Sequence, residues 1–151
     1  MVDISVLMAV HNESTELIAC AIQSIMNQSM QTFELILCDD ASNLVVSQYL
    51  KKIQMSDDRI HLLRSDENLY AGKTRNMGLK VAKGRYIAIL DADDYSYPDR
   101  LKIQYEFLES HSQYAFVCSD ADIYDGKNTL PSQYKLKSDP EKEDFLWGMP
   151  F

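Results

Sequence analysis

The sequence has little cysteine, little positive charge and no long apolar run. Its three cysteines are odd in number and widely spaced, which argues against a disulfide framework or a zinc site. Because Cys20, Cys38 and Cys118 lie among apolar residues, we expect buried free thiols. No apolar run approaches the roughly 20 residues of a membrane span, and no basic, then apolar, leader precedes the first strand-like segment. These absences predict no transmembrane segment and a cytoplasmic location.

Acidic residues outnumber basic ones by 23 to 15, and the net charge is -8. This balance argues against nucleic acid or anionic lipid as the main partner, since both require a basic surface. An anionic small molecule would need local lysine or arginine, a helix N-terminus or a metal ion. At 151 residues and 46% hydrophobic content, the chain is long enough for one domain with a substantial core.

Apolar segments alternate with segments of helical spacing. The expected strands are residues 4–10, 33–38, 59–63, 86–90 and 115–118. Helices are expected between them, one of which contains Gly78 for close packing and ends at Gly84. A polar loop at 125–139 and a short helix at 141–147 follow. Such alternation predicts an α/β fold, with a mostly parallel sheet and helices on both faces.

Three carboxylates follow the apolar segment 86–90, namely Asp91, Asp93 and Asp94. Ligands of open α/β sheets bind at the carboxyl ends of the strands, where these residues would lie. Carboxylates packed so closely repel one another, so a site that keeps them ionised usually contains a cation. Oxygen ligands favour Mg or Mn. The alternative is a solvated acidic turn that caps the following helix.

Other polar residues follow strands at the same expected edge. His11 could stack on a base, or it could be a packing or capping residue. Asp40 could accept a hydrogen bond from a base N–H group, or it could cap a helix. Lys73 and Arg75 lie near a helix N-terminus, where positive charge is unfavourable unless an anionic ligand or a carboxylate ion pair is present.

Five segments resemble, in order, the signatures of the inverting family 2 glycosyltransferases, which have the GT-A fold. They are residues 4–12 (ISVLMAVHN), 24–29 (SIMNQS), 33–42 (FELILCDDAS), 74–79 (TRNMGL) and 83–94 (KGRYIAILDADD). The resemblance covers residues 4 to about 108. It implies a Rossmann-like, mostly parallel sheet that binds a nucleotide sugar.

The same resemblance assigns Asp91-Ala92-Asp93 to the family's DxD motif. Asp93 would then be the direct ligand of Mn or Mg, while Asp91 would lie nearer the ribose or a metal-bound water. Ala92, between them, would belong to the nucleotide-sugar-binding segment.

By resemblance, the remaining donor-site residues are His11, Asp40 and Arg75. Asp40 would read the nucleobase, Arg75 would contact the base or a phosphate, and His11 would line the base pocket. A UDP-sugar is the expected donor. One departure is Tyr70, which stands where the family often has glycine, and another is Ser42-Asn43-Leu44 in place of the commoner Ser-Thr-Asp.

The resemblance also implies an organisation and a reaction. Residues 1–120 would form the nucleotide-sugar-binding core, and residues 121–151 a loop and the start of an acceptor-binding region, so that the chain is truncated before the acceptor-binding half. The catalytic base would lie beyond Phe151. The activity would be metal-dependent, inverting sugar transfer to an acceptor glycan or lipid-linked sugar in polysaccharide or glycoconjugate synthesis. The full-length protein could be peripheral at the inner face of the membrane.

Two alternatives follow from the same segments. The chain could be a non-catalytic nucleotide-binding fragment or a regulatory module. Truncation before the acceptor-binding half would leave apolar residues near the end of the chain without a partner surface, so self-association through this face is a further hypothesis. These residues are Leu146, Trp147, Met149 and Phe151.

Overall fold

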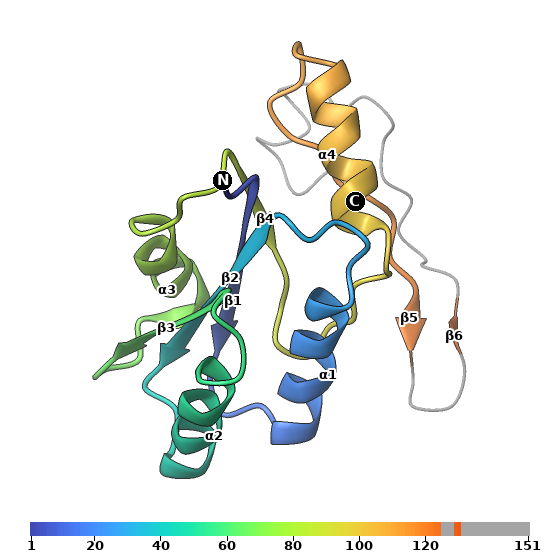
Figure 1. The fold of residues 1–151 in the computed structure, drawn as a ribbon. Coiled ribbons are helices and arrows are strands. Elements are labelled where there is room, and N and C mark those ends of the chain that lie inside the picture. Colours follow the sequence, from blue (N-terminus) through green and yellow to red (C-terminus); the bar gives the residue numbers. More distant parts are fainter. Residues whose placement is uncertain (125–128, 131–151) are drawn as a thin grey trace, which may run out of the picture.

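The structure, a computed structural model, describes residues 1–124, 129 and 130. Strands and helices alternate as far as residue 110 (Figure 1). The strands are β1 (Ile4–Val10), β2 (Phe33–Asp40), β3 (Ile60–Ser65) and β4 (Tyr86–Ile89), and the helices are α1 (Thr15–Met26), α2 (Leu44–Gln54), α3 (Tyr70–Leu79) and α4 (Arg100–Ser110). A short antiparallel pair follows, formed by β5 (Ile123–Tyr124) and β6 (Thr129–Leu130).

The first four strands form one parallel sheet in the order β3-β2-β1-β4. Ile4 of β1 lies in register with Phe33 of β2 on one side and Tyr86 of β4 on the other. Because β1 has a neighbour on each side, it is buried along almost its whole length, as its mostly apolar sequence predicts. The four strands point the same way, so the polar residues that follow them come out at one edge of the sheet.

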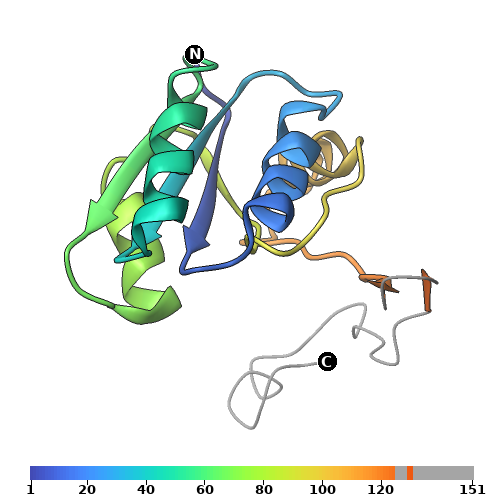
Figure 2. The same ribbon diagram turned by 90° about the horizontal axis from the view of Figure 1, so that it is seen from below.

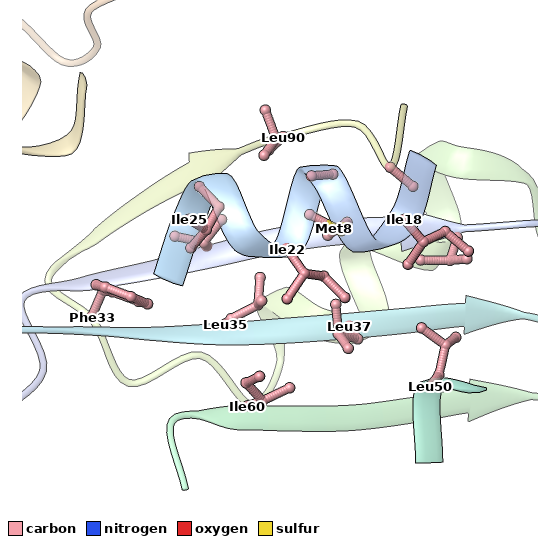
Figure 3. Close-up of a cluster of buried hydrophobic side chains, with 14 of the residues drawn as sticks. Met8, Ile18, Ile22, Ile25, Phe33, Leu35, Leu37, Leu50, Ile60 and Leu90 are labelled. Carbon is pink, nitrogen blue, oxygen red and sulfur yellow. The ribbon is translucent and has the colours of Figure 1, made fainter. Parts of the chain in front are cut away.

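Helices cover both faces of the sheet, with α1 and α2 on one face and α3 on the other (Figure 2). Ile18, Ile22 and Ile25 lie on one side of α1 at helical spacing and pack over Met8 and Leu35 of the sheet (Figure 3). Each such buried side chain contributes about 1.5–3 kcal/mol. The α/β fold class expected from the sequence is confirmed.

On the opposite face, α3 packs closely on the strands because it has glycine at the contact. A methyl group at Gly78 would lie 2.7 Å from the Sγ atom of Cys38 and 3.2 Å from Cδ2 of Leu7. Cys38, Leu7 and Ile36 form a smaller apolar cluster against which Met77 of α3 packs. The expectation of close packing at Gly78 is confirmed, and this packing fixes the helix that carries Arg75.

Two expected elements differ in the structure. Residues 115–118 do not form a strand, and β4 is the last strand of the sheet in the described part of the chain. Ala115, Phe116 and Val117 instead line a cavity of mixed polar and apolar character beside β4. A short apolar run is compatible with a strand or with packed coil, because only ladder hydrogen bonds to a neighbour make it a strand. The third helix ends at Leu79 rather than at Gly84, which lies against the backbone of β1.

Other expectations lie outside the described residues. They concern the loop at 125–139 apart from residues 129 and 130, the helix at 141–147 and the apolar residues Leu146, Trp147, Met149 and Phe151. At Thr129 and Leu130 the expected loop is wrong, because these residues form β6 by pairing with β5. The division at residue 120 stays a prediction. Among the described helices, none has the length and apolar character needed to cross a membrane.

All three cysteines are free thiols, as expected, but only Cys38 is buried. Cys20 and Cys118 are exposed, so the expectation of burial was wrong for them. Cys20 lies on the solvent side of α1, because apolar neighbours in sequence do not set which side of a helix a residue occupies. Cys118 lies in the segment that does not form the expected strand.

The difference in burial predicts a difference in thiol reactivity. Burial raises the pKa of Cys38 to about 11, so little of its reactive thiolate exists at pH 8. A disulfide reagent such as Ellman's reagent is expected to titrate two thiols quickly in the native protein and all three in denaturant. In the variant Cys38→Ala, both titrations should give two thiols. Fast reaction of three thiols in the native wild type would contradict the burial of Cys38.

Candidate functional site

A cavity of about 220 Å³ opens at the carboxyl edge of the sheet, between the ends of β1, β2 and β4 and the start of α3. It is lined by Ala9, Val10, His11, Glu13, Asp40, Ala71, Arg75, Asp91, Ala92 and Asp93. The six site residues expected from the sequence, His11, Asp40, Arg75, Asp91, Ala92 and Asp93, are all among them. Segments far apart in sequence, from Ala9 to Asp93, therefore meet around one space.

The backbone around this cavity is unusual at three points. Asn12, Ala41 and Tyr70 have left-handed backbone angles, with φ of 64°, 54° and 62°. They follow β1, β2 and β3 respectively, and they are the only non-glycine residues with positive φ in the described part of the chain. Such conformations cost about 1 kcal/mol or more each and concentrate at functional sites. Tyr70 thus keeps the left-handed backbone for which glycine is better suited.

His11 and Asp40 hold each other at one end of the cavity. The Nδ1–H group of His11 donates to the backbone oxygen of Asp40 at 2.6 Å, which leaves Nε2 to accept from the side-chain amide of Asn68 at 3.2 Å. Asp40 is buried, and its Oδ1 atom accepts from the backbone N–H of Leu69 at 2.6 Å. The side chain of Asn43, not Asp40, caps α2, so the capping alternative for Asp40 is wrong.

At the other end of the cavity, Arg75 forms an ion pair with Asp91. This contact matches the ion-pair alternative for Arg75, yet it leaves the Nε atom of Arg75 buried without a hydrogen-bond partner within the described residues. A buried unsatisfied donor on a charged group is costly, and a ligand oxygen would remove that cost. Lys73, also expected at this edge, is exposed and does not line the cavity.

The acidic turn stands apart from the helix that follows it. α4 begins at Arg100, and no side chain caps it at Asp99. The alternative of a helix-capping acidic turn is therefore wrong for residues 91–94. Partial burial, with the nearby charges of Asp91 and Asp93, raises the pKa of Asp94. The turn thus carries repulsion between carboxylates that a cation would relieve.

The donor atoms at this turn partly fit a divalent cation. They are carboxylate oxygens, which suit Mg or Mn, and Asp91 and Asp93 both line the cavity. Among the described residues, however, no group of three or more His, Cys, Asp or Glu side chains is arranged to hold a metal ion. The residues therefore fit an ion that takes most of its ligands from water and from another molecule's oxygens.

Sequence reasoning missed Glu13, Ala71 and Asn68. Glu13 lines the cavity, and its carboxylate accepts a hydrogen bond from the backbone N–H of His11 at 2.7 Å. From the sequence alone, its position indicates only a favourable negative charge near the start of a helix. Asn68 holds His11 from the start of the α3 segment. Its place in the polar turn Ser65-Asp66-Glu67-Asn68 was the available signal, but only tertiary structure shows its partner.

A parallel sheet with helices on both faces and a polar cavity at its carboxyl edge defines the chain as a ligand-binding α/β domain. The sequence profile of Glycosyl transferase family 2 matches residues 5–149. The chain therefore belongs to glycosyltransferase family 2.

Named relatives agree with this assignment. A glycosyltransferase of Methanocaldococcus jannaschii is 34% identical over 94% of this chain and 48% of its own length. The putative glycosyltransferase EpsE of Bacillus subtilis is 37% identical over 98% of this chain and 53% of its own length. The Escherichia coli enzyme WfaP, a UDP-Glc:alpha-D-GlcNAc-diphosphoundecaprenol beta-1,3-glucosyltransferase, is 35% identical over 71% of this chain and 41% of its own length. The chain thus spans about half the length of these curated relatives.

Solved structures show the same fold. Residues 1–349 of S. aureus TarS in complex with UDP-GlcNAc superpose with a TM-score of 0.66 at 27% identity, covering 73% of this chain and 32% of that one. The corresponding UDP complex gives a TM-score of 0.65 and covers 33% of that chain. The GT-A fold expected from the sequence is confirmed.

Proposed function

We propose that this chain forms the donor site of a glycosyltransferase that uses a nucleoside diphosphate sugar, with a UDP-sugar as the donor. The observation that carries this proposal is the convergence of His11, Asp40, Arg75, Asp91 and Asp93 on one cavity. Family membership and the UDP and UDP-GlcNAc complexes of TarS support the ligand class.

The two ends of the cavity suit the two ends of such a donor. His11 and the buried Asp40 offer a flat ring and a hydrogen-bond acceptor, which suit a nucleobase. Arg75 offers a fixed positive charge and an unsatisfied N–H group, which suit a phosphate. The ion pair between Arg75 and Asp91 would hold that charge in place before the ligand arrives.

We assign Mn or Mg to the acidic turn, held by Asp93 with Asp91. The cation would supply electrostatic stabilisation of the diphosphate as it leaves the sugar. Asp91 and Asp93 would orient that end of the donor, and the diphosphate oxygens and water would complete the coordination that the protein begins. Such a cation would need only two protein side chains, which is consistent with the described residues containing no group of three or more His, Cys, Asp or Glu side chains arranged to hold a metal.

For the whole protein we propose sugar transfer to an acceptor hydroxyl with inversion, with the catalytic base supplied from outside residues 1–151. The acceptor would be a glycan or a lipid-linked sugar, and the product a polysaccharide or glycoconjugate. Support comes from the relative WfaP, a glucosyltransferase that acts on a diphosphoundecaprenol-linked sugar. Formation of a glycoside of inverted configuration by the full-length protein is the test of this step.

Calorimetric titration of this chain with UDP tests the donor site. UDP should bind about tenfold more tightly with Mn²⁺ than with EDTA, a ratio equal to about 1.4 kcal/mol. In Asp93→Ala the difference between the two conditions should disappear. Asp58→Ala, an exposed carboxylate in the turn before β3, is the matched control and should behave as the wild type. Equal binding with and without metal, unaffected by Asp93→Ala, would contradict the metal assignment.

A further inference from the structure

Arg64 connects the end of β3 to the turn that follows β2. One of its N–H groups donates to the carboxylate of Asp39, and another donates to the backbone oxygen of Ser42 at 3.0 Å. Asp39 is fully buried and also accepts the backbone N–H of Ser42 at 2.9 Å. A buried carboxylate needs such partners. The guanidinium of Arg64, the carboxylate of Asp39 and the backbone of Ser42 are each hydrogen-bonded to the other two.

These hydrogen bonds link the residues on either side of Asp40 and Ala41. Asp40 ends β2, Ala41 has the left-handed φ of 54°, and Ser42 is the residue that Arg64 and Asp39 hold. The β-ladder fixes the turn before Asp40, and Arg64 fixes it after Ala41. Ala41 keeps its strained conformation only while the β-ladder at Asp40 and the hydrogen bonds at Ser42 are both intact.

The same turn also supports the segment after β1 that contains His11. The hydroxyl of Ser42 donates to the backbone oxygen of Val10 at 3.3 Å, and it accepts the backbone N–H of Asn12 at 3.4 Å. The side-chain oxygen of Asn12 accepts the backbone N–H of Asn43 at 2.8 Å. Fixing the position of Ser42 therefore fixes both segments, those of His11 and Asp40, at the end of the cavity proposed to bind the nucleobase.

We infer that Arg64 is a positioning residue for nucleobase recognition, acting through Asp39 and Ser42 on the carboxylate of Asp40. Arg64 itself does not line the cavity. The inference rests on the proposed function, because it takes Asp40 as the group that contacts the base. The inference gives Arg64 no role at the acidic turn of residues 91–94, because that turn follows β4.

Arginine suits this position for a geometric reason. Its planar guanidinium reaches Asp39 and Ser42 with two different N–H groups at once, in fixed directions. Lysine would keep the charge beside the buried Asp39 but would not hold both groups in that geometry. Arg64→Lys therefore loosens the turn while it keeps the buried carboxylate paired.

The test is UDP binding by Arg64→Lys, with Mn²⁺ present. UDP affinity should fall about tenfold, as for one misplaced hydrogen bond in the site. The Mn²⁺ concentration that gives half-maximal binding at saturating UDP should stay within about twofold of the wild type. Arg59→Lys is the matched control, because Arg59 pairs with Asp57 at 2.8 Å before the start of β3, away from the cavity. It should leave both quantities unchanged.

The outcomes separate this inference from the proposed function. If the wild type does not bind UDP, the proposed function fails. If the wild type binds and Arg64→Lys binds UDP equally well, the positioning role fails while the donor site stands. If Arg64→Lys weakens UDP and Mn²⁺ together, or if Arg59→Lys weakens UDP as much, Arg64 acts on the fold in general and the inference is also wrong.

Discussion

Replacing Gly84 by alanine is expected to destabilise the protein by about 3–5 kcal/mol. The added methyl carbon would lie 2.3 Å from the backbone N of Ser5 and 2.5 Å from the carbonyl carbon of Ile4. Backbone atoms cannot turn aside as a flexible side chain can, so the segment before β4 must move away from β1. That movement removes the hydrogen bond from Gly84 N–H to Ser5 Oγ at 2.8 Å.

A second buried contact is lost with it. The Oε1 atom of Glu34 accepts from the hydroxyl of Ser5 at 2.6 Å and from the backbone N–H of Lys83 at 2.6 Å. Moving Lys83 with Gly84 leaves this buried carboxylate with fewer donors, which is costly. The midpoint of thermal unfolding should therefore fall by about 10 °C.

Gly72 provides the control for this substitution. A methyl group there would meet nothing within 4 Å, and Gly72 lies exposed within α3. Gly72→Ala should leave stability unchanged or raise it by about 0.5 kcal/mol, since alanine favours a helix. Urea unfolding of the two variants measures the contrast. A loss of less than about 1 kcal/mol in Gly84→Ala would contradict the close approach of the two backbones.

The fold could be predicted where burial is strong enough to show in the sequence. β1 and β2 are central strands that are buried on both faces, so their sequences are apolar runs that end in polar residues. The failure at residues 115–118 has the opposite cause. This short apolar run is mostly exposed, with Phe116 52% exposed, so its apolar character secured neither burial nor the hydrogen bonds to a neighbour that a strand requires.

The site could be predicted in its composition but not in its connections. Parallel strands bring their carboxyl ends together, so Asp40 and Asp91 had to lie at one edge. Hydrogen bonds such as Asn68 to His11, or Arg64 to Ser42, depend on loop conformations with left-handed residues. No periodicity encodes these conformations. Tyr70 shows this limit, since its residue type alone does not predict positive φ.

The second large effect is expected at Arg75. Arg75→Met should weaken UDP binding about 100-fold, because hydrogen bonds to charged groups contribute about 1.5–3 kcal/mol. Among the residues that the structure describes, the cavity lining contains the carboxylates of Glu13, Asp40, Asp91 and Asp93 but only one cationic side chain, that of Arg75. A diphosphate entering this lining would meet uncompensated negative charge once Arg75 is removed. Calorimetry with UDP and Mn²⁺ measures the loss.

Lys73→Met separates contact from general charge. It removes the same charge from the same helix, but Lys73 is exposed and outside the cavity lining. At physiological salt, screening over about 8 Å should limit its effect on UDP binding to about twofold. An equal loss in both variants would show that the cavity responds only to net charge, which would contradict a direct role for Arg75.

Arg75→Met should also have an opposite effect on the metal alone. The ion pair with Arg75 now competes with a cation for the carboxylate of Asp91. In Arg75→Met, Mn²⁺ in the absence of nucleotide should bind a few-fold more tightly, because the positive charge of Arg75, which repels the cation at close range, has been removed. Electron paramagnetic resonance of free Mn²⁺ measures this affinity. Weaker UDP binding with tighter Mn²⁺ binding places Arg75 between the metal and the phosphate, whereas a parallel loss of both would indicate a disrupted acidic turn instead.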